Sequence, residues 1–424
     1  MGWVMLLMPV ALMAIGFPFF IVLLATSIVV LVFFAGVPPA ALHQVMFSSI
    51  DKYALLAVPF FIFAGDLMGR GGVSARLVRW VTSMLGGIPG RVPFTALGAA
   101  TAFSAVSGST AATVAAVGGL TYGRLREAGY SESFSSGLLV SAGSLGNLIP
   151  PSIGFILYGI ATDTSIVKLF AAGIVPGLVL AAFFAAYVLF HCLRRRERRI
   201  GRFDLAEFVA ATRDGIWSIA APVLILGGIY AGIFSPTEAA GIACVYALVV
   251  VTLVYREVTP SEVFASARRS MYLTAQVLII VAAAGVYSWL LTVSGAPQTA
   301  IDHVEALDVA PWAVLLAINV FLLAVGCVLD TASAILVLAP LLVPIANALG
   351  IDPVHFGVIV VMNLSLGTFT PPFGINIFVG QAIFQAPLSS IYTGIVPFAL
   401  VGIAALMVVT YVPGLSLWIL QFLG

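Results

Sequence analysis

The sequence predicts an all-α polytopic membrane protein, and three observations support this class. Of the 424 residues, 62% are hydrophobic and only 8% are charged, whereas soluble domains carry roughly 25% charged residues. The stretch from Pro353 to Gly424 contains no Asp, Glu, Lys or Arg. The apolar runs reach about 20 residues without alternation, which favours membrane helices over strands. A soluble enzyme and a nucleic-acid binder are therefore excluded, and a net charge of +1 implies no polyanionic partner.

The apolar stretches between charged segments define the expected spans. An N-terminal block covers 3–41, where Gly16 and Pro18 mark either a hairpin or a kink. The stretches 92–123 and 311–349 are too long for one span, and polar or small residues interrupt each. Their shorter halves cannot cross a ~30 Å hydrocarbon core, so both are predicted to be re-entrant hairpins. The remaining spans are expected at 53–69, 134–160, 170–191, 215–234, 239–255, 270–291, 357–379 and 392–412.

The basic residues orient these spans. With the arginine-rich run from Arg194 to Arg202 in the cytoplasm, 16 of the 18 Lys and Arg residues fall on that side. Only Lys52 and Lys168 fall outside, a bias that the positive-inside rule predicts. The bias holds only if both hairpins re-enter without crossing.

The chain resembles itself at an offset of 221 residues. SLG at 144–146 recurs at 365–367, PP at 150–151 recurs at 371–372, and GIVP at 173–176 recurs at 394–397. Basic residues follow the first hairpin, whereas acidic residues precede the second. Together with the count of crossings, this makes the repeat inverted, which is typical of secondary transporters with broken helices. The alternative is a duplication that only stabilises a helical bundle.

Each copy contains a helix break in the middle of a span. The segments 146–151 and 367–372 each combine a glycine with two prolines, which remove backbone donors and unwind a helix. Freed carbonyls and nearby hydroxyls suit a small hard cation, and half-helix N-termini suit an anion. We therefore expect two pseudo-symmetric cation sites flanking one substrate site, between the breaks and the hairpin tips. For any single serine, the alternative is a hydrogen bond to its own helix.

Candidate substrate-binding residues lie at the tips, beside the breaks and at the external mouth. Asp330 is the only acidic residue expected near mid-membrane, where a carboxylate is costly and indicates function. It could bind a cation, carry a proton, or cap the helix that begins at Thr331. Lys52 could attract an anion or could be an interfacial lysine whose amine reaches the surface. The full predicted substrate set is Lys52, Ser109, Thr110, Asn147, Asp330, Thr331, Asn363 and Asn376.

Five motifs, in this order, resemble the large membrane subunit of tripartite ATP-independent periplasmic (TRAP) transporters, the DctM-like family. They are LLAVPFFIFAG at 55–65, FSAVSGSTAA at 103–112, LGNLIPPS at 145–152, PTEAA at 236–240 and TPPFG at 370–374. The resemblance covers nearly the full length. It departs from the family pattern at Asn147, where an aliphatic residue is usual, so an additional amide could contact the ligand.

The resemblance implies uptake of an organic acid, such as a dicarboxylate or a sialic acid, across the bacterial inner membrane. A sodium gradient would drive uptake, and no organic cofactor is implied. A periplasmic substrate-binding protein would deliver the substrate, and a small four-helix membrane subunit would be a separate chain. The sodium sites of the family map onto Ser104, Ser107, Gly146, Ile149 and Pro150 in the first copy, and onto Gly326, Gly367, Thr370 and Phe373 in the second.

The resemblance also implies an elevator mechanism, in which a transport domain moves against a scaffold. We expect scaffold helices at 1–70 and 169–291, the latter including a cytoplasmic amphipathic linker at 194–214. The two halves of the transport domain are expected at 71–168 and 292–385, and a C-terminal scaffold helix is expected at 386–424.

Three other functions compete with this interpretation. A stand-alone carrier of the same elevator type would need no binding protein. A channel is disfavoured because symmetric broken helices favour alternating access. A membrane-embedded enzyme is disfavoured because the four histidines are scattered and none pairs by spacing with a carboxylate or a cysteine.

Overall fold

The computed structural model describes the chain except for residues 39, 197–202, 307–308 and 423–424. The described residues form helices and connecting turns, with no strand among them, so the all-α prediction is confirmed. The elements are α1 (Gly2–Ala14), α2 (Phe19–Val30), η1 (Leu31–Ala35), α3 (Ala40–Ile50), η2 (Tyr53–Leu56), α4 (Ala57–Arg70), α5 (Val73–Met84), α6 (Arg91–Ser107), α7 (Thr110–Thr113), η3 (Val114–Gly118), α8 (Gly119–Glu127), α9 (Glu132–Ala142), α10 (Leu145–Leu148), α11 (Ile153–Thr162), α12 (Ile166–Arg194), α13 (Leu205–Tyr230), α14 (Pro236–Val249), η4 (Val250–Val254), α15 (Pro260–Val293), α16 (Ala296–Ala306), α17 (Pro311–Gly326), α18 (Thr331–Ala348), α19 (Pro353–Gly367), α20 (Ile375–Phe384), α21 (Leu388–Tyr411), α22 (Gly414–Leu417) and η5 (Trp418–Phe422).

Several helices are long and apolar enough to span a bilayer. Among the described residues there are 7 such helices, and the pair formed by α9–α10 and α11, bent by 42°, makes up to 8. This confirms a polytopic membrane protein. The straight candidates are Tyr53–Arg70, Ile166–Arg194, Leu205–Tyr230, Pro236–Val254, Pro260–Val293, Thr331–Ala348 and Leu388–Tyr411.

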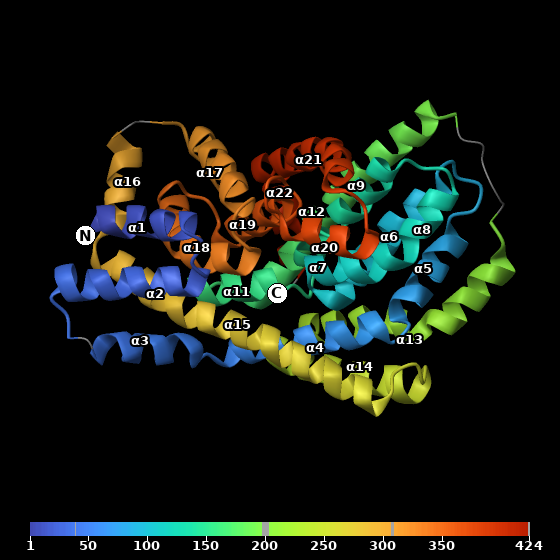
Figure 1. Ribbon diagram of the computed structural model, residues 1–424, viewed down its shortest axis with the longest axis horizontal. Coiled ribbons are helices and arrows are strands. Elements are labelled where there is room, and N and C mark those ends of the chain that lie inside the picture. The colour runs from blue at the N-terminus through green and yellow to red at the C-terminus, as the bar shows by residue number, and fades with distance from the viewer. Residues whose placement is uncertain (39, 197–202, 307–308, 423–424) are drawn as a thin grey trace.

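The N-terminal block is a pair of packed helices. Helix α1 ends before Gly16, whose φ is +93°, and Pro18 is the N-cap of α2. A positive φ suits glycine, and proline cannot continue a helix. Figure 1 shows α2 returning alongside α1. Of the two alternatives for 3–41, the structure therefore shows the hairpin.

Two helices begin earlier than their expected spans. Asp204 caps α13 by accepting a hydrogen bond from Ala206 N at 2.9 Å, so the end of the expected linker 194–214 forms the first turns of α13. Residues 197–202 of that linker lie outside the described part of the chain. A capping box of Thr259 and Glu262 starts α15, which is 34 residues long and begins ten residues before the predicted span. Local capping chemistry thus extends both helices beyond their apolar cores.

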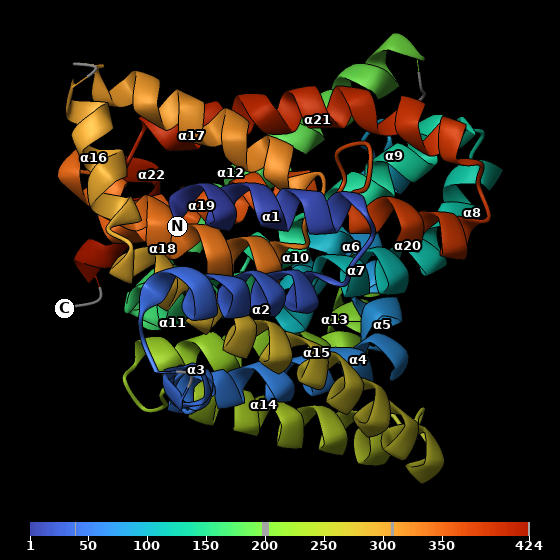
Figure 2. The ribbon, with the colours of Figure 1, turned by 60° about the vertical axis from the view of Figure 1, so that its left-hand side comes forward.

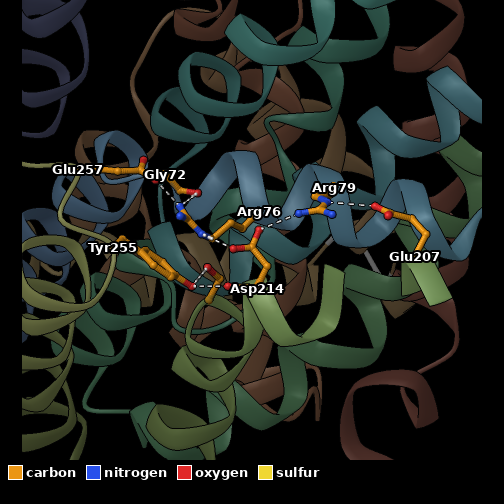
Figure 3. A network of polar contacts seen from close by, with 8 residues as sticks. Gly72, Arg76, Arg79, Glu207, Asp214, Tyr255 and Glu257 are labelled. Atoms are coloured by element: carbon orange, nitrogen blue, oxygen red, sulfur yellow. Dashed lines mark hydrogen bonds and ion pairs between the residues drawn. The ribbon is translucent and has the colours of Figure 1, made fainter. Parts of the chain in front are cut away.

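The sequence did not predict the amphipathic helix α5. Ion pairs join α5 to helix α13 and to Glu257, which lies between η4 and α15 (Figure 3). Arg76 pairs with Asp214 of α13 at 3.4 Å and with Glu257 at 2.6 Å, and its guanidinium carbon lies 3.7 Å from the centre of the Tyr255 ring. Because α5 also packs against α6, it connects α13 to the first hairpin.

The helices form two packed groups. Helices α3, α4, α13, α14 and α15 lie together along one side of the molecule in both views (Figures 1 and 2). We call this set the outer layer. Helix α21 packs mainly against α9, and α12 packs mainly against α21 and α19. The packing therefore places α12 and α21 beside the broken helices. The expected division into scaffold segments at 169–291 and 386–424 and a moving transport domain stays a prediction.

Candidate ion and substrate site at the helix breaks

The first break lies between α10 and α11 and is buried. Residues 146–152 are all inaccessible or nearly so. Ser152 donates a hydrogen bond to the carbonyl of Asn147 and accepts one from Phe155 N at 3.4 Å, which caps α11. The polar groups released by the unwound backbone are thus partly satisfied inside the protein, as a break within a membrane requires.

The first hairpin tip lies directly against this break. Gly108 has a φ of +60° and separates α6 from α7, and Ser109 caps α7 by accepting from Ala112 N at 3.4 Å. A methyl group on Gly146 would lie 2.4 Å from the carbonyl oxygen of Ser109. The amide of Ile153 donates to Gly108 O at 3.4 Å. The structure therefore brings together the tip and the break that were expected to face one another.

The two predicted cation-binding serines of the tip have different partners. Ser104 is fully buried and donates to Ala100 O at 2.7 Å. It thus makes the hydrogen bond to its own helix that was expected from the sequence as the alternative to a ligand role for any single serine. Ser107 lies 3.1 Å from the Thr113 hydroxyl and 3.4 Å from the backbone of Ser109. Ser107 therefore contributes to a cluster of oxygen atoms inside the tip.

The second break, between α19 and α20, combines close packing with exposure. A methyl group on Gly367 would lie 2.5 Å from the carbonyl carbon of Gly326, so the end of α17 packs directly on this break. Thr370 donates to Leu366 O at 2.7 Å. Phe373 is 60% exposed, unlike the buried residues of the first break. The backbone is therefore closely packed at both predicted cation sites. The first site is buried throughout, whereas the second includes the exposed residue Phe373.

Asp330 is the N-cap of α18. Its carboxylate accepts from Ser333 N at 3.2 Å and also from the Ser333 hydroxyl. Of the three roles considered for this residue, the structure shows the cap. The hydroxyl of the neighbouring Thr331 is buried and has no hydrogen-bond partner among the described residues, which leaves an oxygen available to a ligand.

Asn376 joins the two copies. Its amide nitrogen donates to Thr368 Oγ1 at 3.1 Å and to Val140 O of α9 at 3.4 Å, while Oδ1 is buried without a partner in the described chain. A methyl group on Gly143 would lie 3.0 Å from both Asn376 Nδ2 and Thr110 O. Figure 2 shows the corresponding approach of α20 to α7. Asn376 and Thr110 thus lie at one junction.

Two other predicted substrate residues lie in different environments. Asn147 is 8% exposed, and its side-chain amide makes no hydrogen bond within the described residues. Asn363 is fully buried and donates to Asn319 Oδ1 at 2.7 Å, and Asn319 in turn donates to Thr410 Oγ1 at 3.1 Å. Sequence reasoning missed Asn319 and Thr410. A polar residue within an apolar span was the available signal.

Lys52 lies between the outer layer and α11. Its amine donates to Ile160 O at 2.9 Å and pairs with Asp163 at 3.4 Å. It also lines a cavity of about 160 Å³ with Ser49 of α3 and Pro340 of α18. Lys52 therefore binds the carboxyl-terminal end of α11.

Comparison with known proteins identifies the family. The family described as "Tripartite ATP-independent periplasmic transporter, DctM component" matches residues 6–415. The C4-dicarboxylate TRAP transporter large permease protein DctM of Pseudomonas aeruginosa is 39% identical over 89% of this chain and 89% of its own length. The ectoine/5-hydroxyectoine large permease protein UehC of Ruegeria pomeroyi is 37% identical over 97% of this chain and 96% of its own length.

A solved structure shares the fold. The YdaH transporter of Alcanivorax borkumensis superimposes with a TM-score of 0.69 at 16% identity, covering 98% of this chain and 100% of that one. At this identity the similarity extends to the fold alone.

Proposed function

Because the chain belongs to the DctM component family of TRAP transporters, as its motifs predicted, we propose that it is the large transmembrane subunit of a sodium-coupled importer of an organic acid anion. The chain is a membrane transport protein and not an enzyme. The partners implied by the family are a periplasmic substrate-binding protein and a small four-helix membrane subunit in the bacterial inner membrane.

The packing of each hairpin tip on the helix break of its own copy is the observation that carries this proposal. Hairpin tips pack on helix breaks through Gly146 with Ser109 and through Gly326 with Gly367. Buried oxygen atoms of Thr331 and Asn376 lack partners among the described residues. Carbonyl and hydroxyl oxygens are the ligands that a hard cation prefers, so the oxygen atoms of the tips and breaks fit sodium. The oxygens of Thr331 and Asn376 without a partner in the described chain are left for the substrate.

We assign the sodium-binding role to the backbone and hydroxyl oxygens at the two breaks. The first site would use Ser104, Ser107, Gly146, Ile149 and Pro150, and the second would use Gly326, Gly367, Thr370 and Phe373. The substrate would bind between them, near Thr110 and Asn376. During transport, the broken helices would move against the outer layer.

A sodium titration tests the coupling. The purified chain is melted in detergent with sodium chloride replaced by choline chloride at constant ionic strength. A ligand specific to the folded state adds about 2.7 kcal/mol of stability at a hundredfold excess over its Kd. Sodium should therefore raise Tm, and Ser107→Ala or Thr370→Ala should reduce that rise.

Thr252→Ala is the matched control, because Thr252 donates to Leu248 O at 2.6 Å just as Thr370 donates to Leu366 O, but lies in α14–η4. If Thr252→Ala and Thr370→Ala changed the sodium-dependent rise in Tm equally, the assignment of Thr370 to a sodium site would be rejected. Equal Tm in sodium and choline would count against sodium coupling.

Uptake by proteoliposomes distinguishes the tripartite importer from a stand-alone carrier. Radiolabelled dicarboxylates and sialic acid are offered under an inward sodium gradient, with and without the two partner proteins. Uptake should require all three components. Uptake by the chain alone would instead support a stand-alone sodium- or proton-coupled anion carrier.

A further inference from the structure

A basic cavity lies away from the helix breaks, between α5, α6, α8 and α13. Its volume is about 300 Å³, at the lower end of the range for ligand pockets. Three guanidinium groups and one carboxylate line it. The lining residues are Ala75, Arg79, Thr82, Ser83, Arg91, Arg124 and Glu207.

The carboxylate does not neutralise all three arginines. Arg79 pairs with Glu207 at 3.0 Å and with Asp214 at 3.3 Å (Figure 3), and the hydrogen bond that Arg79 donates to Glu207 raises the pKa of Arg79. Arg91 donates to the neutral carbonyl of Thr82 at 3.0 Å. The Arg124 side chain forms no hydrogen bond or ion pair within the described residues. Arg91 and Arg124 therefore give the cavity an excess positive charge.

The guanidinium groups keep donors free for an anion. A guanidinium carries five N–H donors and binds phosphate through two at once. Arg91 uses only Nε and Nη2, both toward Thr82 O, whereas the Ser83 hydroxyl already donates to Trp80 O at 2.6 Å. The donor set fits a phosphate group.

Exposed apolar side chains close in sequence to the lining residues suggest a place for the rest of the ligand. Met84 follows Ser83 and is 45% exposed, and Ile88 is 36% exposed. Leu205, two residues before Glu207, is 64% exposed. A free inorganic anion would gain nothing from these residues, whereas acyl chains would bury them. Basic pockets between membrane helices on the cytoplasmic side bind anionic headgroups.

We propose that this cavity binds the phosphodiester headgroup of an anionic phospholipid such as phosphatidylglycerol. Arg91 and Arg124 bind the phosphate, and the acyl chains lie along Met84 and Ile88. The lipid would bridge α5 to both arms of the first hairpin.

The test compares lipid-dependent stability of the purified chain in neutral detergent. Phosphatidylglycerol should raise Tm more than phosphatidylcholine in the wild type. In Arg124→Gln the half-saturating lipid concentration should rise roughly fivefold, since one arginine near the surface adds about 1 kcal/mol. Arg268→Gln is the matched control, because Arg268 is exposed outside the cavity, and it should respond as the wild type does.

Native mass spectrometry supplies a readout independent of stability. Wild type and Arg268→Gln should retain a phosphatidylglycerol adduct that Arg124→Gln loses. An identical lipid titration and adduct in Arg124→Gln would overturn the proposal. A Tm rise reproduced by inorganic phosphate or glycerol phosphate would also overturn it, because the occupant would then be a free anion.

Discussion

A side chain has no room where the first hairpin tip meets the first break. At Gly146 an added methyl group would meet the Ser109 carbonyl oxygen at 2.4 Å, and that neighbour is backbone. A flexible side chain could rotate away, whereas backbone must shift the tip as a whole. Glycine at this residue therefore permits the close approach that builds the site.

We predict that Gly146→Ala destabilises the chain by about 1–3 kcal/mol, the usual cost of overpacking, and lowers uptake. The matched control is Gly123→Ala in α8, where a methyl group would meet no atom within 4 Å and helix propensity favours alanine by up to ~1 kcal/mol. Thermal melts and uptake measure both effects. If Gly146→Ala had the wild-type Tm, the hairpin tip and the break would be packed less closely than the distance from Gly146 to the Ser109 carbonyl oxygen indicates.

Asp330 and Ser109 occupy equivalent positions and play the same local role. Each is an N-cap whose side chain accepts from a backbone amide three residues later. A serine is a good cap without charge. The geometry therefore accounts for Asp330 without requiring its charge.

We predict that Asp330→Ser retains folding and uptake, while Asp330→Ala loses about 1 kcal/mol of stability with the cap. Thermal melts and sodium-driven uptake of the two variants distinguish the contribution of the helix cap from that of the negative charge. Stable but inactive Asp330→Ser would show instead that the carboxylate binds a cation or carries a proton.

At the scale of elements, the 221-residue offset also relates helix starts. Helix α7 starts at Thr110 and α18 at Thr331, and α9 starts at Glu132 and α19 at Pro353. The two copies thus share their element order. An inverted arrangement in the membrane stays our proposal.

Labelling of introduced cysteines tests re-entry of the first hairpin. In a variant without the native cysteines, Ile88→Cys and Glu127→Cys flank the hairpin, and both should react with a membrane-impermeant maleimide only from the cytoplasm. Lys168→Cys, expected outside, is the control for periplasmic access. Labelling of Ile88→Cys and Glu127→Cys from opposite sides would mean that the segment crosses the membrane.

For the whole molecule, the contact of Lys52 with α11 joins the outer layer to the broken helices. The Lys52 and Asp163 side chains are 40% and 92% exposed, and exposed ion pairs contribute only about 0–1 kcal/mol. This contact could therefore break at little cost if the two groups move relative to one another.

We predict that cross-linking Lys52→Cys to Asp163→Cys with a short reducible reagent abolishes uptake, because it would hold α11 to the outer layer. Reduction should restore uptake. Each single-cysteine variant, treated identically, controls for modification. Full uptake by completely cross-linked protein would show that transport requires no relative motion at this contact.

The sequence by itself determined the membrane class, the helix breaks and several helix ends. These follow from composition and from chemistry within a few residues, such as the consecutive prolines at 150–151. Only the tertiary structure decided that Asn376 contacts α9, that Asn363 pairs with Asn319, and that α12 packs with the broken helices. Such contacts join segments tens to hundreds of residues apart. They depend on how whole helices pack, which neither composition nor local backbone preference specifies.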